Sequence, residues 1–222
     1  LLAHMVGSSL LTLKDPKESF PVALWQSAIP VRTKFTKEQQ LRLPNSLEEA
    51  LTRANAKSAA WLVAPEGTLP VNGELLSPSP IPFLTGGFRW VKGAQRSSLL
   101  VFDIGEKKFS QAIDKFRLVP LGEKVPSFFG YSVGGLSGVG GIHPGEPSRL
   151  LSWAGPPLAA VICYEISDGH AVASAVKEGA EWILALANLD PYPISLQKQF
   201  VALAQLRSIE TSRDLISVAN MG

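Results

Sequence analysis

Short apolar runs of strand length, separated by amphipathic stretches of helix length, most constrain the fold of this 222-residue chain. Residues 158–163 and 182–187 are continuous apolar runs, as in strands that are buried on both faces of a sheet. Residues 169–178 and 195–212 follow these runs and have the composition and apolar spacing of helices. Because strands and helices alternate in this way, we predict an α/β sandwich in which helices cover the sheets.

The rest of the chain follows the same alternation. A helix is expected to start within residues 44–51, with Asn45 or Ser46 as its N-cap and glutamates in its first turn. Residues 22–25 are expected to form a buried strand, and residues 60–65 another that ends at Pro65, since proline donates no hydrogen bond to a sheet. The remaining apolar runs that we interpret as strands are residues 81–85, 98–102 and 215–219.

The charges and the cysteine content exclude several classes of function. The net charge of +2 comes from interspersed residues of both signs, with no basic run of the kind that binds phosphate backbones. A nucleic-acid partner is therefore not expected. One cysteine can form neither an internal disulfide nor a thiolate zinc cluster, and the three histidines lie far apart in the sequence. We accordingly expect no metal and no cofactor.

The two ends of the chain lead us to expect a fragment of a longer protein. Residues 1–13 form an apolar run shorter than the roughly 20 residues needed to span a bilayer. By itself this run fits the end of a membrane helix, the remnant of a signal sequence or an ordinary buried segment. The other end follows directly on the strand-like run 215–219, and a fold seldom ends on a core strand. We therefore expect the domain to be incomplete at its C-terminus.

Cys163 is the first candidate for catalysis. It stands at the end of the apolar run 158–163, and strand ends are where α/β folds expose reactive side chains. A turn at this point can also aim the next backbone N–H at a developing oxyanion. The alternative is a small inert core residue, which is the commoner role of a cysteine beside Ile and Val. Position alone leaves both interpretations open.

Glu66 and Lys115 are weaker candidates when each is taken alone. Glu66 lies between Pro65 and Pro70 at the end of an expected strand, so its carboxylate should be partly desolvated and suited to act as a base. A solvated loop is the alternative. Lys115 could stabilise a thiolate or an oxyanion, but its charged neighbours fit a surface lysine as well.

Taken together, these residues resemble a known superfamily. The order Glu, Lys, Cys at similar intervals is similar to that of the nitrilase, or carbon–nitrogen hydrolase, superfamily. Three local motifs sharpen the resemblance to the apolipoprotein N-acyltransferase family: Pro65-Glu66 with Pro70, Lys115 followed by Leu-Val-Pro, Gly-Glu and Val-Pro, and Cys163-Tyr164-Glu165. The resemblance runs from about Pro21 to the end, with weaker support from Gln26, Ile29, Pro30, Arg207, Glu210, Arg213 and Asn220.

This resemblance implies a nitrilase-like α-β-β-α sandwich and a covalent mechanism. Glu66 would take the thiol proton, and Cys163 would attack the sn-1 ester of a phospholipid. The acyl chain would then pass from the Cys163 thioester to the α-amine of the diacylglyceryl-cysteine at an apolipoprotein N-terminus. Lys115 and a backbone N–H near Tyr164 would hold the oxyanion. Glu123 would orient Lys115, and Tyr164 and Glu165 would support the site.

The resemblance also implies a membrane setting. Members of the family carry several membrane helices before this domain and one after it. Residues 1–20 would then be the end of a preceding membrane helix with its linker, and residues 21–222 the nitrilase-like domain. We expect a location in the bacterial inner (plasma) membrane, with the domain facing the periplasm. Without its helices and its C-terminal strands, the fragment is expected to be inactive.

Two stretches depart from a simple match. Many bacterial members carry Asn-Asp-x-Trp-Phe in a loop near the acyl site, whereas residues 188–193 read Asn-Leu-Asp-Pro-Tyr-Pro. This difference predicts a different acyl-chain or lipoprotein preference. Residues 130–145 are rich in glycine but lack the Gly-Lys-Ser/Thr of a phosphate-binding loop. They could form an arm that opens for lipid or a plain disordered loop.

Three other functions remain as alternatives. A soluble amidase or nitrilase would use the same triad for hydrolysis, although residues 165–168 differ from the Asp and Arg-containing segment that usually follow Cys-Tyr in soluble members. A catalytically inactive, nitrilase-like interaction domain would lack a triad residue, and none is missing. A papain-like Cys–His enzyme would need a histidine motif, which neither His143 nor His170 provides.

Overall fold

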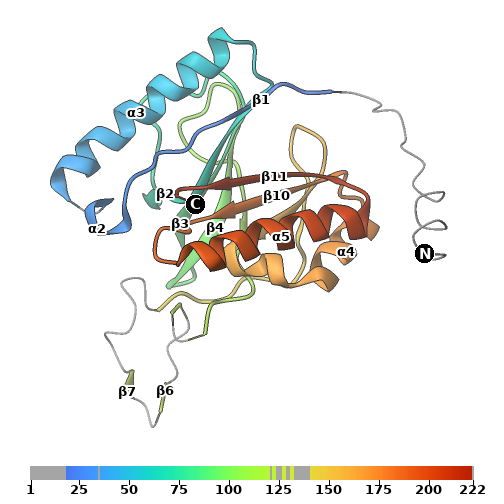
Figure 1. Cartoon of the computed structure of the whole chain (residues 1–222). Helices are drawn as coiled ribbons and strands as arrows, with labels where there is room; N and C mark the ends of the chain where they lie inside the picture. Colours follow the sequence, from blue (N-terminus) through green and yellow to red (C-terminus); the bar gives the residue numbers. More distant parts are fainter. Residues whose placement is uncertain are drawn as a thin grey trace.

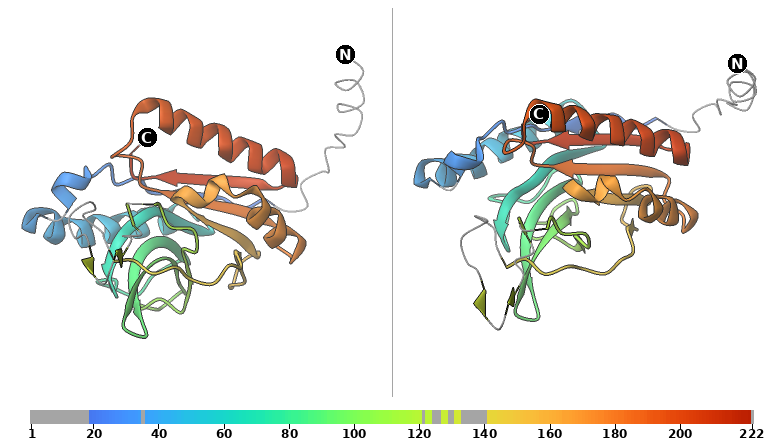
Figure 2. Two further views of the ribbon diagram at one scale, coloured as in Figure 1. Left: turned by 90° about the horizontal axis from the view of Figure 1, so that it is seen from below. Right: turned by 60° about the horizontal axis from the view of Figure 1, so that its bottom comes forward.

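Two β-sheets packed face to face form the centre of the protein, with helices on both outer faces (Figures 1 and 2). The structure is a computed structural model that describes residues 19–34, 36–120, 122–123, 127–128, 131–132 and 141–221. Its order of layers is helix, sheet, sheet, helix, which confirms the predicted α-β-β-α sandwich.

Five strands form the first sheet. They lie in the spatial order β1 (Val22–Leu24), β2 (Trp61–Val71), β3 (Phe83–Val91), β4 (Ala94–Phe102) and β5 (Gln111–Asp114). The first three strands are parallel, and β4 and β5 are each antiparallel to the strand before them. The short helix α2 (Val31–Lys34) and the long helix α3 (Lys37–Ala56) connect β1 to β2, because a parallel pair requires a crossover.

The second sheet carries the strand that precedes Cys163. Its order is β11 (Asp214–Ala219), β10 (Trp182–Ala187), β9 (Leu158–Ile162) and β8 (Leu150–Leu151). The strands β9, β10 and β11 are parallel, and β8 is antiparallel to β9. The 3-10 helix η1 (Cys163–Ser167) and α4 (Gly169–Lys177) connect β9 to β10, and α5 (Ile194–Thr211) connects β10 to β11. Outside the two sheets, β6 (Ser127–Phe128) pairs with β7 (Tyr131–Ser132).

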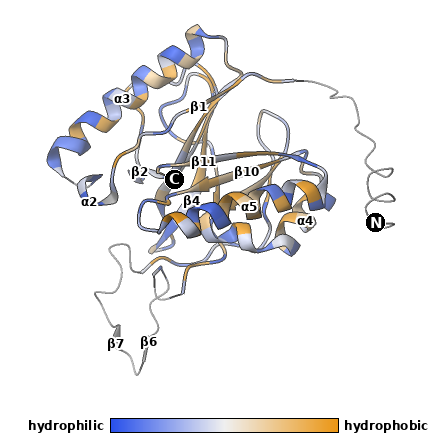
Figure 3. Ribbon diagram, in the orientation of Figure 1, coloured by the Kyte–Doolittle hydropathy of each residue, from blue (hydrophilic) through white to orange (hydrophobic). Residues whose placement is uncertain are grey.

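Three apolar interfaces hold the four layers together. Between the sheets, Trp61 and Leu84 of the first sheet pack in one cluster with Leu158 and Leu184 of the second. The helix α3 covers the outer face of the first sheet through buried residues such as Leu51, while α4 and α5 cover the second sheet. Apolar residues accordingly gather on the strands between the helical layers, as the hydropathy colours show (Figure 3).

The start of the first long helix differs from the prediction. The helix α3 begins at Lys37, and its N-cap is Thr36, whose side chain accepts a hydrogen bond from the N–H of Gln39 at 3.4 Å. Pro44 lies inside the helix, and Asn45 donates to the carbonyl of Leu41 at 3.3 Å instead of capping. The predicted start within residues 44–51 is wrong because the helix already has a true cap, Thr36, more than two turns before Asn45, and the cap-like residues lie within it.

Two strand predictions also need correction. The strand at residues 22–25 was expected to be buried, but β1 lies at the edge of its sheet, with Val22 half-buried and Leu24 exposed. An edge strand has a neighbour on one side alone, so less of it is covered. The apolar run that ends at Cys163 forms a strand up to Ile162, and Cys163 itself begins η1.

The strand expected to end at Pro65 continues to Val71, but its pairing with β3 breaks after Ala64. Ala64 aligns with Thr85, and the next aligned residue of β2 is Leu69. Between them the backbone passes so close to Gly86 that a Cβ on Gly86 would lie 2.4 Å from the Cα of Glu66. The break therefore lifts Glu66 out of the regular ladder and needs a glycine beneath it.

Two predicted segments lie largely outside the described residues. The end of a membrane helix was placed in residues 1–20, of which the structure describes residues 19 and 20. Most of the glycine-rich stretch 130–145 is likewise not described. Within the described ranges, none of the helices combines the length and the apolar character needed to cross a bilayer.

We predict that Gly86→Ala destabilises the protein by roughly 1–3 kcal/mol, because the new methyl group meets backbone atoms of Pro65, Glu66 and Gly67 that cannot move freely. The neighbouring variant Gly87→Ala is the matched control, since its methyl group would meet the flexible end of Leu100 at 2.7 Å. Urea denaturation of both variants measures the difference. Equal stability of the two would contradict the role assigned to Gly86.

Candidate active site

The three predicted catalytic residues stand at or next to breaks in regular strands, and the fold brings them together. Glu66 lies in the irregular part of β2, Lys115 follows the last residue of β5, and Cys163 follows the last residue of β9. Glu66 accepts a hydrogen bond from Lys115 across 49 positions of sequence. The charges of Glu66 and Lys115 both act on the thiol of Cys163. The site thus joins both sheets of the sandwich.

Lys115 is a buried residue and not a surface lysine. Its side chain has no exposed area, and its Nζ lies 3.1 Å from Oε1 of Glu66 and 2.7 Å from Oε1 of Glu123. Its charged neighbours are engaged elsewhere: Asp114 accepts both hydrogen bonds of a bidentate pair from Arg89, and Arg117 pairs with Asp168. The surface interpretation is therefore excluded.

Backbone N–H groups fix the two carboxylates that hold Lys115. The second oxygen of Glu66, Oε2, accepts a hydrogen bond from the N–H of Asn188 at 3.1 Å, directly after β10. The second oxygen of Glu123 accepts from the N–H of Val119 at 2.9 Å. The backbone N–H of Lys115 donates to the carbonyl of Ser97 at 2.8 Å. Each carboxylate that binds the Lys115 ammonium through one oxygen is thus held by a backbone N–H group through its other oxygen.

Opposite charges keep Lys115 protonated in spite of its burial. Burial alone lowers the pKa of an ammonium. The charge of Glu66, followed by that of Cys163 in its thiolate form and that of Glu123, outweighs this effect and raises the pKa of Lys115. The site therefore contains a permanent cation that is coupled electrostatically to Cys163.

Cys163 is a thiol in the unliganded protein. Burial raises the pKa of Cys163, and the negative charges of Glu66 and Glu123 raise it further. Lys115 and a hydrogen bond from the backbone N–H of Tyr164 act in the opposite direction but are outweighed. Its φ of +51° is a left-handed conformation that non-glycine residues seldom adopt, and such strain is concentrated at functional sites.

The buried carboxylate of Glu165 links the backbone before Cys163 to the backbone after Lys115. Its Oε1 accepts hydrogen bonds from the N–H groups of Phe116 at 2.7 Å and Arg117 at 3.1 Å, and its Oε2 accepts from the N–H of Ile162 at 2.9 Å. Arg149 neutralises its charge through a contact of 2.9 Å between side chains that are both nearly fully buried. Glu165 thus fixes the residues on either side of the site, and its supporting role in catalysis stays a prediction.

Two tyrosines neighbour Cys163: Tyr164 follows it in the sequence, and Tyr192, in the loop after β10, is coupled to it electrostatically. Tyr164 is 42% exposed, unlike its buried neighbours Cys163 and Glu165. In the loop 188–193, burial raises the pKa of Tyr192, and the charge of Cys163 adds to this rise. The loop that departs from the bacterial pattern therefore interacts electrostatically with Cys163 when the thiol loses its proton.

Two contributors to the site were not found from the sequence. Arg149 carries the charge that balances Glu165, but it stands in no motif and its neighbours read as a loop. The backbone of Asn188 holds Glu66, and a backbone donor leaves no signal in residue types. Asn220, singled out by the resemblance alone, is buried and bonds to Ser27, Ile29 and Asn188.

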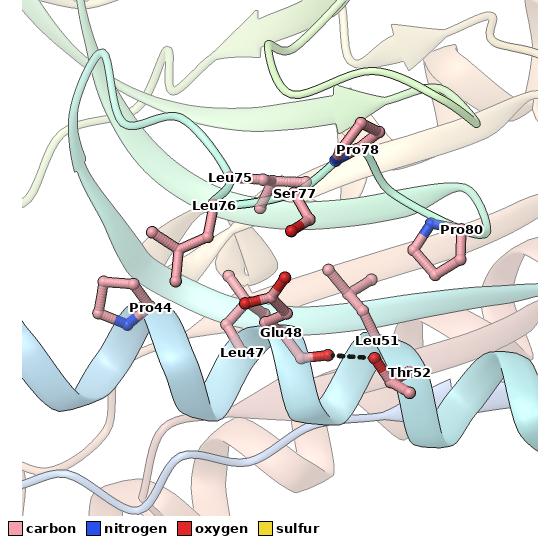
Figure 4. Close-up of a pocket in the computed structure, with 10 residues that line it drawn as sticks. All are labelled: Pro44, Leu47, Glu48, Leu51, Thr52, Leu75, Leu76, Ser77, Pro78 and Pro80. Carbon is pink, nitrogen blue, oxygen red and sulfur yellow. Dashed lines mark hydrogen bonds between the residues drawn. The ribbon is translucent and has the colours of Figure 1, made fainter.

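A hollow on the surface lies elsewhere. A groove of about 170 Å³ runs between α3 and residues 75–80, and Figure 4 shows the side chains that line it. Leu47, Leu51 and Leu75 form much of its wall, and none of the three triad residues lines it. Among the described residues, no group of three or more His, Cys, Asp or Glu side chains is arranged to hold a metal ion. The groove is thus separate from the candidate site, whose shared feature is its buried charges.

Curated proteins named apolipoprotein N-acyltransferase match the chain from end to end. One from Prochlorococcus marinus (strain MIT 9313) is 61% identical over all 222 residues, and one from Parasynechococcus marenigrum (strain WH8102) is 49% identical over an alignment of 223 positions that covers the whole chain. The chain spans less than half the length of these relatives, 44% and 48%. No protein-family model matches the chain. The resemblance to this family, first read from three short motifs, is confirmed.

Solved structures confirm the nitrilase-like fold. An amidase from Nesterenkonia sp. superimposes with a TM-score of 0.63 at 17% identity, covering 93% of this chain and 78% of the amidase. A variant of the Nesterenkonia AN1 amidase, described as a member of the nitrilase superfamily, superimposes with a TM-score of 0.62 at 17% identity, with coverage of 92% and 78%. At this level of identity the likeness concerns the fold alone.

The raised pKa of Cys163 predicts how the rate of its alkylation depends on pH. A thiolate is the reactive form, and it is scarce at neutral pH when the pKa lies above its ordinary value. The alkylation rate of the native protein by iodoacetamide should therefore rise about tenfold per pH unit from about pH 7 to pH 9 without levelling off. Cys163 is the one cysteine of the chain, so the measured rate belongs to it alone.

The protein unfolded in urea provides the control, because its thiol regains an ordinary pKa of about 8.5 and its rate should level off above that value. A plateau of the native rate below about pH 8 would instead reveal a stable ion pair between a Cys163 thiolate and Lys115.

Proposed function

We propose that this chain provides the acyl-transfer site of an apolipoprotein N-acyltransferase, with Glu66, Lys115 and Cys163 as its catalytic residues. The observation that carries the proposal is the buried ammonium of Lys115, held between Glu66 and Glu123 and coupled to the one thiol of the chain. The sequence similarity to curated proteins of that name supports the choice of reaction.

The first step forms a thioester. Because Cys163 is protonated at rest, its proton must leave as the sulfur attacks the ester carbonyl of the donor. The carboxylate of Glu66 is buried with the thiol, and each of its oxygens keeps a lone pair beside the bond that it already accepts. Glu66 takes this proton and returns it to the departing glycerol oxygen. The products are a Cys163 thioester and a lysophospholipid.

The second step transfers the acyl chain to an amine. The α-amine of a diacylglyceryl-cysteine attacks the thioester carbonyl, and Glu66 moves the amine proton to the leaving sulfur. An amide and a free Cys163 thiol result. In both steps the negative charge develops on the carbonyl oxygen, where Lys115 and the N–H of Tyr164 are suited to stabilise it.

The other predicted residues position the catalytic groups. Glu123 holds Lys115 charged and aimed through its contact of 2.7 Å, and Glu165 fixes the backbone beside Lys115 and Cys163. Tyr164 supplies its N–H at the oxyanion, and the residue itself is exposed. These roles follow from the bonds that each residue makes, and they extend the proposal beyond the triad.

The setting is part of the proposal. An acyl donor and a lipoprotein acceptor that both reside in a lipid bilayer require the site to lie at its surface. We assign the domain to residues 21–222, place it on the periplasmic side of a bacterial inner membrane, and assign residues 1–20 to the end of a preceding membrane helix with its linker. The partners are a phospholipid, an apolipoprotein N-terminus and the membrane itself.

Hydrolysis of a small amide is the second candidate, because the solved neighbours of this fold include amidases. The same triad would attack an amide carbonyl, and water would then resolve the thioester. The two candidates differ in the second nucleophile, which an assay can supply directly.

We predict that Cys163→Ala, Glu66→Gln and Lys115→Met each reduce N-acylation of a diacylglyceryl peptide by about a thousandfold or more, since triad members act as a unit. The measurement is product formation by the full-length protein in detergent micelles that contain phospholipid. Glu38→Gln removes an exposed ion pair with Arg42 and serves as the control with unchanged activity. Ammonia release from small amides without acylation of the peptide would favour the amidase instead.

A further inference from the structure

A second lysine lies against the candidate site and is not used by the mechanism. Lys34, the last residue of α2, is partly buried, and its Nζ lies 3.3 Å from the point that a Cβ on Gly67 would occupy. Gly67 directly follows Glu66 and has a φ of +64°. The missing side chain of Gly67 thus leaves the space in which the Lys34 ammonium approaches Glu66.

This ammonium has no close anionic partner among the described residues. The carboxylate next to it is that of Glu66, whose two oxygens are already bonded to Lys115 and to the N–H of Asn188. Burial lowers the pKa of Lys34, and the opposing pull of Glu66 is the weaker effect. A cation that is partly removed from water without a bonded anion costs free energy, which an incoming anion would recover.

The neighbouring segment holds Lys34 in place before any ligand arrives. The buried side chain of Asn220 bonds to Ser27 at 2.6 Å and to the carbonyl of Ile29 at 2.7 Å. Ala28, between these two residues, has a φ of +50°, a conformation that needs such support. The chain then turns into α2, where the N–H of Lys34 donates to the carbonyl of Pro30 at 3.0 Å. The cation is therefore presented by a fixed segment.

Lys34 and Lys115 differ in the groups that already bind their ammonium, and therefore in how freely each can bind a ligand. Lys115 bonds to two carboxylates, and its charge lowers the pKa of the Cys163 thiol. Its proposed place is therefore beside the carbonyl carbon that the thiol attacks. Lys34 is coupled to Glu66 and lies beside Gly67, and within the described part of the chain it forms no hydrogen bond with Lys115 or Cys163. It is thus suited to an anionic group of the substrate that lies away from the bond being broken.

We propose that Lys34 binds a phosphate oxygen of the acyl donor and so selects phospholipids over uncharged acyl glycerols. The inference rests on the proposed function, in which the donor is a phospholipid. The phosphodiester of such a donor is joined to the reacting ester through the short glycerol backbone, so both groups bind within one site. A lysine ammonium is a compact donor suited to phosphate oxygens.

The test compares two donors with the same acyl chains, dioctanoyl phosphatidylglycerol and dioctanoylglycerol. Thioester formation on Cys163 of the full-length protein in micelles is measured as kcat and KM. For Lys34→Met we expect the KM for the phospholipid to rise about tenfold or more, as for loss of a hydrogen bond to a charged group. The KM for dioctanoylglycerol should change much less than that for the phospholipid, and Lys34→Arg should restore part of the difference.

The exposed residue Lys37 provides the matched control, since Lys37→Met removes an equal charge three positions away. It should change neither kcat nor KM for either donor. Equal losses of kcat/KM with both donors in Lys34→Met would show that Lys34 positions Glu66. An unchanged KM for the phospholipid would show that Lys34 binds no phosphate. Either result would overturn this inference but leave the proposed function standing. Stimulation of the dioctanoylglycerol reaction by inorganic phosphate would assign Lys34 to free phosphate instead. Failure of the unaltered protein to acylate Cys163 from either donor would overturn the proposed function itself.

Discussion

The buried ammonium of Lys115 is the interaction on which the site depends. A charged amine without exposed area is stable only when anions and hydrogen bonds replace its water, and here two carboxylates do so. Those carboxylates are fixed in turn by backbone N–H groups of Asn188 and Val119. Removal of one partner from such a buried arrangement typically costs about 3–5 kcal/mol, so stability and chemistry rely on the same contacts.

The sandwich places this interaction where its two sheets meet. Regular strands pack between the helical layers, and each reactive side chain stands where a strand or its pairing stops: Glu66 at the break of β2, Lys115 after β5 and Cys163 after β9. Glu165 then joins the second and third of these points through bonds to Phe116 and Ile162. The rigid layers fix the positions, and the irregular residues between them carry the reactive groups.

The sequence predicts the layers well because uninterrupted apolar runs of strand length leave few alternatives, and β9, β10, α4 and α5 lie within a residue or two of their expected positions. It fails where local signals compete, as at Pro44, which lies inside a helix capped by Thr36. Motifs identify Glu66, Lys115 and Cys163 as candidates, and the structure brings them together. Arg149 and the N–H of Asn188 escape prediction because long-range pairing and backbone donors leave no local pattern.

The central claim is that an acyl chain passes through Cys163, and a thioester trap tests it most directly. The full-length protein is mixed with a phospholipid of defined chains but no amine, and its peptides are weighed by mass spectrometry. The account predicts a gain of one acyl chain on the peptide that contains Cys163, and its transfer to a diacylglyceryl peptide when that acceptor is added. Acylated acceptor formed in a single turnover, while Cys163 stays unmodified throughout, would contradict the account.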